Sequence, residues 1–321
     1  MPDTEPLIIL GPTAVGKSAL GLELARRHGG EIVSLDSMQV YRGMDIGTAK
    51  PTAAEREACP HHVIDCRDVT EDWDVARHIA AVRAAEEDIQ MRGRLPILVG
   101  GTAMYIKALV DGLSEELPGS DTVRTELAAE AGRRGAARLH AEELMQVDPE
   151  SAARIHPNDK RRIIRALEVY RMTGRPMSEL QTQWRADSDT HYRMIGLTMP
   201  REQLYARIDA RVHAMMDAGL VAEVRRVQAL GVEKNASAAG AIGYAEILAY
   251  LAGAHDRDRA VELIQRNTRR FAKHQLTWFR GDARIAWFDV NAYARIDMLA
   301  DAVEYFLVTG GPTAEPPPRL T

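Results

Sequence analysis

The stretch PLIIL (6–10) followed by GPTAVGKS (11–18) decides the fold of this 321-residue chain. An apolar run typical of a buried strand leads into a glycine-rich octet of the pattern G-x-x-x-x-G-K-[ST], and ALGLELARR (19–27) continues as a helix. Gly11 and Gly16 allow a tight turn whose N–H groups point at one anion, and the dipole of the following helix adds positive potential. The octet therefore predicts a phosphate-binding loop, without naming a reaction.

The loop offers both charge and oxygen donors to a phosphate group. Lys17 supplies a mobile ammonium for terminal phosphate oxygens, and the hydroxyl of Ser18 is a candidate ligand for Mg²⁺. A chance glycine-rich turn is the alternative, but it does not account for the full octet between a strand and a helix. The candidate phosphate-binding residues are Gly11, Pro12, Thr13, Ala14, Val15, Gly16, Lys17 and Ser18.

Strand-like and helical patterns alternate through the first third of the chain. Further β-rich runs stand at 31–35, 62–65 and 95–99, and helical patterns at 18–28 and 75–91. Such alternation is typical of βαβ units, which form a parallel sheet with helices on both faces. We therefore predict an α/β fold: a P-loop NTPase-like parallel sheet flanked by helices.

A long helical stretch interrupts this alternation from about residue 122 to 186, after which strand-like runs return at 191–199 and 283–290. We therefore predict that an all-helical domain is inserted into the sheet domain. Between the two late strands the pattern is mostly long amphipathic helix, over 200–228, 243–253 and 256–280. The expected bounds are 1–114 and 191–321 for the catalytic core with its C-terminal helices, 115–190 for the insertion, and 316–321 (PPPRLT) for a disordered tail.

Composition excludes several classes of protein. With 45% apolar and 27% charged residues the chain is typical of a soluble globular protein, and no apolar run or N-terminal leader pattern suggests a membrane or secretion. We expect it in the cytoplasm. Cys59 and Cys66 are too few for a disulfide framework or a four-thiolate zinc site, and their spacing from His61 and His62 fits no standard metal-ligand pattern.

Charge is distributed unevenly along the chain. The net charge of −5 argues against a nucleic-acid partner, yet residues 151–285 carry 23 basic and 15 acidic side chains, a net charge of +8. Residues 1–150 carry 16 basic and 26 acidic ones. Such asymmetry suggests a polyanionic partner for the second half. Within it, Gln265 to Arg280 holds five Lys or Arg, no acidic residue, and Phe271, Trp278 and Phe279, a mixture suited to RNA.

The carboxyl ends of the expected strands carry the candidate chemistry, because ligands of open α/β sheets bind there. Asp36 follows the strand at 31–35, and Gly100, Gly101 and Thr102 follow the strand at 95–99. A phosphate-hydrolysing enzyme would place an acidic residue after the latter strand. Position alone leaves two roles open for Asp36, a general base near the phosphate loop or the cap of a helix.

Seven segments of the chain form a recognisable series: GPTAVGKS (11–18), DSMQVYRGMDIGTAKP (36–51), VGGTAMYIKAL (99–109), ARIHPNDKRRIIRALEVYRMTGRPMSEL (153–180), LYARIDARVHAMMDAGLVAEV (204–224), AIGYAE (241–246) and RRFAKHQLTWFRG (269–281). In this order they resemble the bacterial tRNA dimethylallyltransferases, and the resemblance covers about residues 6–290. It implies transfer of a dimethylallyl group from dimethylallyl diphosphate to N6 of adenosine 37, next to the anticodon, in tRNAs that read codons beginning with U.

The resemblance implies roles for individual residues. Asp36 would be the general base, Thr102 an active-site contact to the tRNA and Arg211 a cation on the diphosphate, with Mg²⁺ as cofactor. The target base would be flipped into a channel, the tRNA would lie between core and insertion, and the enzyme would be a monomer. The implied contacts to the tRNA and its anticodon stem-loop are Asp36, Ser37, Met38, Gln39, Thr102, Arg124, Lys160, Arg161, Arg162, Ile163, Ile164, Gly240, Ala241, Ile242, Gly243, Tyr244 and Ala245.

The sequence departs from the family pattern at one place and leaves rival functions open. Gly240 and Ala245 stand where relatives often carry basic or amide side chains, which puts the tRNA contact there in doubt. A small-molecule kinase would share the loop and sheet and could use Arg161 and Arg162 in a lid. A prenyltransferase acting on free adenylate and an RNA-binding module that holds a nucleotide only structurally also stay open.

Overall fold

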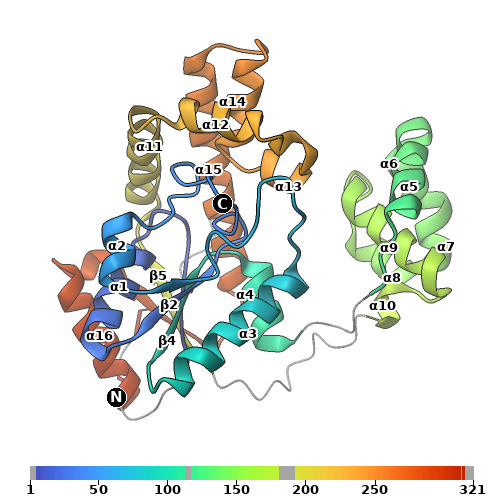
Figure 1. Cartoon of the computed structure of the whole chain (residues 1–321). Coiled ribbons are helices and arrows are strands. Elements are labelled where there is room, and N and C mark those ends of the chain that lie inside the picture. Colours follow the sequence, from blue (N-terminus) through green and yellow to red (C-terminus); the bar gives the residue numbers. More distant parts are fainter. Residues whose placement is uncertain (1–4, 113–116, 181–191, 312, 315–321) are drawn as a thin grey trace. The chain divides into compact units, whose positions relative to one another are not determined.

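The structure is a computed structural model that describes residues 5–112, 117–180, 192–311, 313 and 314 (Figure 1). The chain forms two compact units, one made of Met1–Lys107 with His191–Thr321 and the other of Ala108–Thr190. The first boundary lies inside helix α4 (Ala103–Asp111), a few residues before the expected position 115. The expected tail 316–321 lies outside the described residues.

The first unit is built on a six-stranded parallel sheet of order β3-β2-β4-β1-β5-β6. Its central strand β1 is buried along its length and pairs with β4 on one side and β5 on the other, so that Ile8 lies opposite both Leu98 and Met194. The predicted parallel sheet is confirmed. The strands are β1 (Leu7–Leu10), β2 (Glu31–Leu35), β3 (His61–His62), β4 (Pro96–Gly100), β5 (Arg193–Thr198) and β6 (Ile285–Asp289).

Helices cover both faces of this sheet. Helices α1 (Lys17–His28) and α16 (Ile296–Thr309) pack together on one face, and α3 (Val75–Met91) and α4 lie on the other (Figure 1). Gly21 lets α1 approach β4 closely, because a Cβ at this position would lie 2.8 Å from the Val99 side chain. The layered arrangement leaves the carboxyl ends of β1, β2 and β4 at one edge, where the loops that follow them meet.

Two expected elements differ from the structure. The strand expected at 62–65 is limited to His61–His62, because Val63 and Asp65 adopt positive φ angles of 59° and 52° that no strand allows. The helix expected over 200–228 is two helices, α11 (Arg201–Asp217) and α12 (Leu220–Ala229). The chain turns between them at Gly219, whose φ is 99°.

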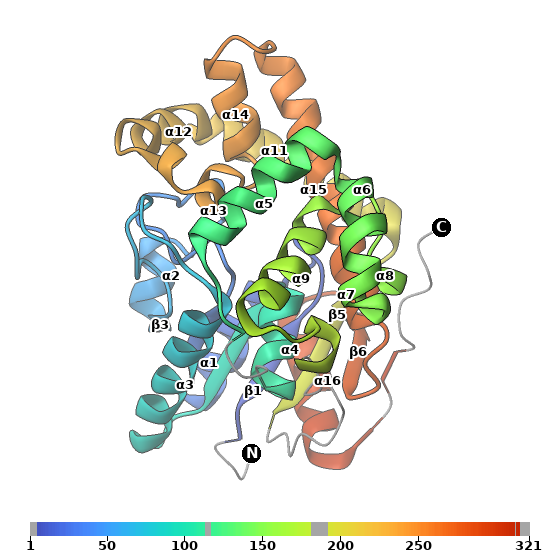
Figure 2. The same ribbon diagram turned by 90° about the vertical axis from the view of Figure 1, so that its right-hand side faces the viewer.

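A group of helices follows β5 in the first unit. Helix α15 packs against both α11 and α14, and α14 also contacts α12 (Figure 2). The remaining elements of this unit are α2 (Ala53–Ala58), η2 (Val232–Lys234), α13 (Ala236–Ala239), α14 (Tyr244–Leu251), α15 (Arg257–Phe279) and η3 (Val290–Ala292). No helix in the described ranges is both long and apolar enough to cross a membrane.

The described part of the second unit is entirely helical and has its own apolar core. Leu127, Leu144, Ile163 and Leu167 belong to that core. Glu168 is fully buried and accepts hydrogen bonds from the backbone of Ser120 and from two arginines, so it joins the start of α5 to α9. The elements are α5 (Asp121–Arg134), α6 (Ala136–Leu139), η1 (His140–Leu144), α7 (Met145–Val147), α8 (Pro149–Arg154), α9 (Lys160–Thr173) and α10 (Met177–Leu180).

Candidate active site

The phosphate loop has the backbone that its sequence predicts. Gly11 and Gly16 have φ angles of 141° and 110°, which L side chains rarely adopt. At Gly11 a Cβ would also lie 2.6 Å from the carbonyl oxygen of Leu197 in β5. Helix α1 begins at Lys17, so its unpaired first-turn N–H groups lie where an anion would bind.

Two cations lie at this loop, and Asp36 is the opposite charge that acts on both of them. The Nζ of Lys17 donates to the carbonyl oxygen of Pro12 at 2.8 Å, and Nη1 of Arg211 on α11 donates to Oγ1 of Thr13 at 3.3 Å. Burial, together with the charge of Arg211, lowers the pKa of Lys17 from 10.5 to about 7. Burial likewise lowers the pKa of Arg211. A bound anion would relieve both effects, so the electrostatics favour an anion here.

Asp36 stands at the carboxyl end of β2. Its Oδ1 accepts hydrogen bonds from the backbone N–H groups of Met38 at 2.8 Å and Gln39 at 3.3 Å. The segment after it is a turn, so a helix cap is the wrong interpretation of this residue. Within the described residues Oδ2 accepts no hydrogen bond, which leaves one carboxylate oxygen able to accept a proton.

Thr102 lies beside that turn. Its Oγ1 accepts a hydrogen bond from the backbone N–H of Ser37 at 3.3 Å, and its carbonyl oxygen accepts from the first turn of α4. The loops after β2 and β4 are therefore joined through Thr102.

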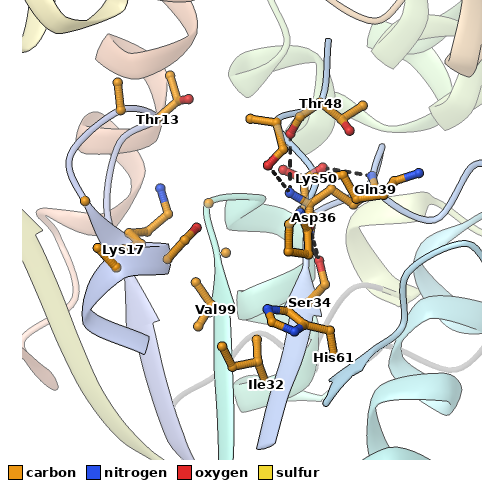
Figure 3. A pocket seen from close by; sticks show the side chains of 18 of the residues that line it. Thr13, Lys17, Ile32, Ser34, Asp36, Gln39, Thr48, Lys50, His61 and Val99 are labelled. Carbon is orange, nitrogen blue, oxygen red and sulfur yellow. Dashed lines mark hydrogen bonds between the residues drawn. The ribbon is translucent and has the colours of Figure 1, made fainter. Parts of the chain in front are cut away.

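Two cavities meet at Asp36. The first, about 370 Å³, is lined by five residues of the phosphate loop and by the end of β2, and Figure 3 shows Thr13 and Lys17 on one side with Asp36, Gln39, Thr48 and Lys50 on the other. The second, about 320 Å³, is lined by the loops after β2 and β4 and by α11, α13 and α15. Five residues line both cavities: Thr13, Asp36, Thr48, Arg211 and Phe271.

The second cavity gathers most of the core residues that the resemblance assigns to tRNA. Eight of them line it: Asp36, Ser37, Met38, Thr102, Gly240, Ala241, Ile242 and Gly243. Gln39 lines the first cavity instead, and its Oε1 accepts a hydrogen bond from Ser34. Tyr244 is fully buried and its hydroxyl donates to Glu223 at 2.6 Å, while Ala245 lies in the first turn of α14. A tRNA contact through the Tyr244 side chain would require it to leave this position.

The remaining predicted tRNA residues lie in the second unit. Lys160, Arg161 and Arg162 are exposed at the start of α9, where Asp159 caps the helix. Arg124 pairs with Glu168 at 3.0 Å. Both isoleucines are buried and belong to the apolar core of this unit. A cavity of about 620 Å³ is lined by Arg124, Ala128, Lys160, Arg161, Ile164, Arg165 and Glu168.

The basic and aromatic stretch on α15 divides into two faces. Phe271 and Trp278 are exposed, but Phe279 is 4% exposed and belongs to the core, so it cannot stack on a base. Arg269 is engaged with the carboxylate of Asp209 at 2.6 Å. Only part of the stretch is therefore available to RNA.

Three residues support the site in ways that the sequence does not predict. Glu223 on α12 accepts backbone hydrogen bonds from Asp45, Ile46 and Gly47 and thereby fixes the loop that carries Thr48. The buried Lys50 donates to Tyr41, Asp45 and Asp65. Gln275 on α15 accepts a hydrogen bond from the backbone N–H of Thr13 in the phosphate loop. The sequence gives no signal for these contacts, since each joins segments that the fold brings together.

The cysteines and histidines between residues 59 and 66 do not form a metal site. His61 lines that cavity, its Nδ1 is 2.8 Å from the carbonyl oxygen of Cys59, and burial lowers its pKa. His62 pairs with Glu31 at 2.7 Å. In the part of the chain that the structure describes, no group of three or more His, Cys, Asp and Glu side chains could hold a metal ion.

A Mg²⁺ ion bound together with a diphosphate needs fewer protein ligands. Mg²⁺ prefers oxygen donors and keeps several waters, using one or two protein groups beside phosphate oxygens. The first cavity provides the hydroxyl of Ser18 and the carboxylate of Asp36 in its lining. These residues fit the ion, with Ser18 as the expected protein ligand.

The fold and site together define a parallel α/β enzyme in which a phosphate-binding loop faces a carboxylate across a cavity. The family model for IPP transferase matches residues 39–282. The chain belongs to the IPP transferase family. The resemblance inferred from its motifs is confirmed.

Relatives of known name cover nearly the whole chain. It is 49% identical over 290 residues to the tRNA dimethylallyltransferase of Geobacter sulfurreducens, covering 90% of this chain and 93% of that protein. For the tRNA dimethylallyltransferase of Symbiobacterium thermophilum the identity is 51% over 290 residues, covering 89% and 90%.

Solved structures of such enzymes share the fold. The tRNA isopentenylpyrophosphate transferase of Bacillus halodurans is 41% identical with a TM-score of 0.70, covering 95% of this chain and 96% of that one. A eukaryotic dimethylallyltransferase described as acting on tRNA is 28% identical with a TM-score of 0.79, covering 98% of this chain and 82% of that one.

Proposed function

We propose that this enzyme transfers a dimethylallyl group from dimethylallyl diphosphate to N6 of adenosine 37 in tRNAs that read codons beginning with U. One observation carries the proposal: two cavities meet at Asp36, one lined by the phosphate loop and the other by the segments that resemble tRNA contacts. A donor diphosphate and an acceptor base entering from the two sides would meet at this carboxylate.

The donor occupies the first cavity. The phosphate loop, Lys17 and Arg211 bind the diphosphate and stabilise the negative charge that grows on it as the C1–O bond breaks. Mg²⁺, held through Ser18 and the phosphate oxygens, would supply further charge stabilisation to the leaving group. No water has to be activated, which agrees with glycines rather than an acidic residue at the end of β4.

The acceptor occupies the second cavity. The adenine is flipped out of the anticodon loop, and its N6 attacks C1 of the allyl group. An exocyclic amine is a weak nucleophile, so loss of its proton to Oδ2 of Asp36 assists the attack. The products are N6-(dimethylallyl)adenosine, diphosphate and one proton, which Asp36 later releases to solvent.

The anticodon stem-loop would bind through exposed basic side chains. Lys160 and Arg161 on the second unit carry no ion pair among the described residues, so their charges are available to phosphates. In the core, the exposed Phe271 and Trp278 offer aromatic faces to unpaired bases. We expect a monomeric enzyme.

Transfer of radiolabel from dimethylallyl diphosphate tests the proposal directly. The acceptors are an anticodon stem-loop with the sequence A36-A37-A38, the same stem-loop with A37 replaced by G, and AMP. We expect label in the A37 stem-loop alone, and only with Mg²⁺ present. Label in AMP alone would make the enzyme an adenylate prenyltransferase.

A kinase control completes the test. The same protein is given labelled ATP with small alcohols as acceptors. Phosphoryl transfer without any prenyl transfer would replace the proposal with a kinase, and tight RNA binding with neither activity would favour an RNA-binding module.

A further inference from the structure

A single peptide group of the phosphate loop is held from both sides. Its carbonyl, that of Pro12, accepts a hydrogen bond from Nζ of Lys17 at 2.8 Å. Its N–H, that of Thr13, donates to Oε1 of Gln275 at 2.9 Å. Gln275 comes from α15, 262 residues further along the chain. The orientation of this peptide decides where the neighbouring N–H groups and the Thr13 side chain point.

The other end of the Gln275 amide is also engaged. Its Nε2 donates to the carbonyl oxygen of Gly101 at 2.9 Å, and the residue is only 4% exposed. The Gly101 carbonyl needs a donor and the Thr13 N–H needs an acceptor, so the Gln275 amide can bind both in one orientation only. Gly101 has no space for a side chain, because a Cβ there would meet Nε2 of Gln275.

Lys17 and Gln275, the two side chains that bond this peptide group, respond differently to a bound anion. The Lys17 ammonium is the group that reaches phosphate oxygens in such a loop, so a bound diphosphate competes with the Pro12 carbonyl for its N–H groups. Among the described residues, Gln275 is the other side chain that bonds this peptide group, and its hydrogen bond does not involve the Lys17 ammonium. It is too deeply buried to be replaced there by water without a loss of packing.

We propose that Gln275 is a positioning residue for the diphosphate. It fixes the peptide between Pro12 and Thr13, and through it the Thr13 hydroxyl to which Arg211 donates. Its second bond ties this loop to Gly101, next to Thr102, whose hydroxyl accepts from Ser37 in the Asp36 turn. The donor loop and the base therefore share one hydrogen-bonded frame. The inference rests on the proposed function only for the identity of the anion.

Calorimetric binding of inorganic pyrophosphate with Mg²⁺ tests the inference without any prenyl transfer. The variants are Gln275→Met, which keeps the length of the side chain and removes both hydrogen bonds, and Gln275→Glu, which turns the donor into an acceptor facing Gly101. The controls are Gln203→Met and Gln203→Glu, on an exposed glutamine of α11 that accepts one hydrogen bond from Asn291. Melting temperatures verify that each variant is folded.

We expect Gln275→Met to weaken pyrophosphate binding by about tenfold, and Gln275→Glu to weaken it further because it adds negative charge beside the anion. The Gln203 variants should bind like the wild type. In the transfer assay KM for dimethylallyl diphosphate should rise while KM for the stem-loop stays unchanged. Folded Gln275 variants that bind pyrophosphate like the wild type would overturn the inference. Normal pyrophosphate binding by a wild type that transfers no label would instead overturn the proposed function alone.

Discussion

Two pairs of cations in this chain are prepared for an anion in opposite ways. Lys17 and Arg211 are half-buried, each with a hydrogen bond to the phosphate loop and a lowered pKa. Lys160 and Arg161 stand exposed at the start of α9. The side chains of the first pair are partly desolvated before an anion binds, which suits one small anion in a fixed geometry. The exposed side chains of the second pair suit a long polyanion that is positioned loosely.

The difference separates the residues that act on the diphosphate and the reaction from the residues that bind the RNA. Interactions in a water-poor site are strong and depend on geometry, while exposed charges are screened by salt and contribute gradually. Changes at the phosphate loop and at Asp36 should therefore act on diphosphate binding and on the rate of transfer. Changes on α9 should act on RNA affinity and its salt dependence.

The largest effect is expected from Asp36→Asn. The amide keeps an oxygen for the N–H of Met38 but cannot take the proton from N6, so kcat should fall by ~10²–10⁴-fold with little change in RNA affinity. Single-turnover transfer to the stem-loop measures it. Asp217→Asn, on an exposed position of α11, is the matched control. Retention of most of the wild-type rate by Asp36→Asn would remove the base from the mechanism.

Lys17→Met should produce the next largest effect. It removes a charge-assisted contact worth ~1.5–3 kcal/mol, so pyrophosphate affinity should fall by about tenfold to a hundredfold. Calorimetry with pyrophosphate and Mg²⁺ measures the loss, with Lys234→Met on an exposed lysine as control. Stem-loop affinity should not change. If both ligands weakened equally, the proposed separation between the two pairs of cations would be lost.

The phosphate loop and Asp36 could be predicted from the sequence, but the side chains that hold the surrounding loops in position could not. Gly11, Gly16 and Asp36 could be placed from the motif and the strand before each loop, because local backbone geometry demands glycine and strand ends share one edge. Gln275 and Glu223 could not be placed. Their partners are backbone groups more than 170 residues away, and no periodicity or motif encodes such a pairing.

The lack of tertiary information in a local sequence pattern also explains two wrong interpretations, the strand expected at 62–65 and the exposure of Phe279. Val63 and Ile64 favour a strand by composition, but Val63 and Asp65 adopt a left-handed backbone in the loop that follows β3. Phe279 belongs to a basic helix by sequence, but the helical period turns it into the core while Phe271 and Trp278 stay outside. Tertiary packing decides which side of α15 is available, and the segment alone does not.

The pH dependence of anion binding sharpens the comparison further. Only the charged form of Lys17 attracts phosphate, and its pKa is about 7 in the protein without a ligand. Above that pH binding must take up a proton, so affinity should fall as pH rises from 7 to 9. Calorimetry in two buffers of different ionisation enthalpy counts the protons taken up at pH 8. Subtracting the count for Lys17→Met corrects for titration of pyrophosphate itself, and equal counts would contradict the lowered pKa.

The smallest effect in any single assay is expected from Lys160→Ala combined with Arg161→Ala. Each exposed charge that contacts a phosphate contributes ~0.7–0.9 to the slope of log K against log salt, so the slope for stem-loop binding should drop by up to about 2. Pyrophosphate affinity should stay at the wild-type value. Arg138→Ala, on an exposed arginine of the same unit that pairs with Glu142, is the control and should leave the slope unchanged. Because the slope counts ion release and not total affinity, it identifies a contact even where affinity moves little. An unchanged slope in the double variant would mean that Lys160 and Arg161 form a solvated face and that other residues contact the RNA phosphates.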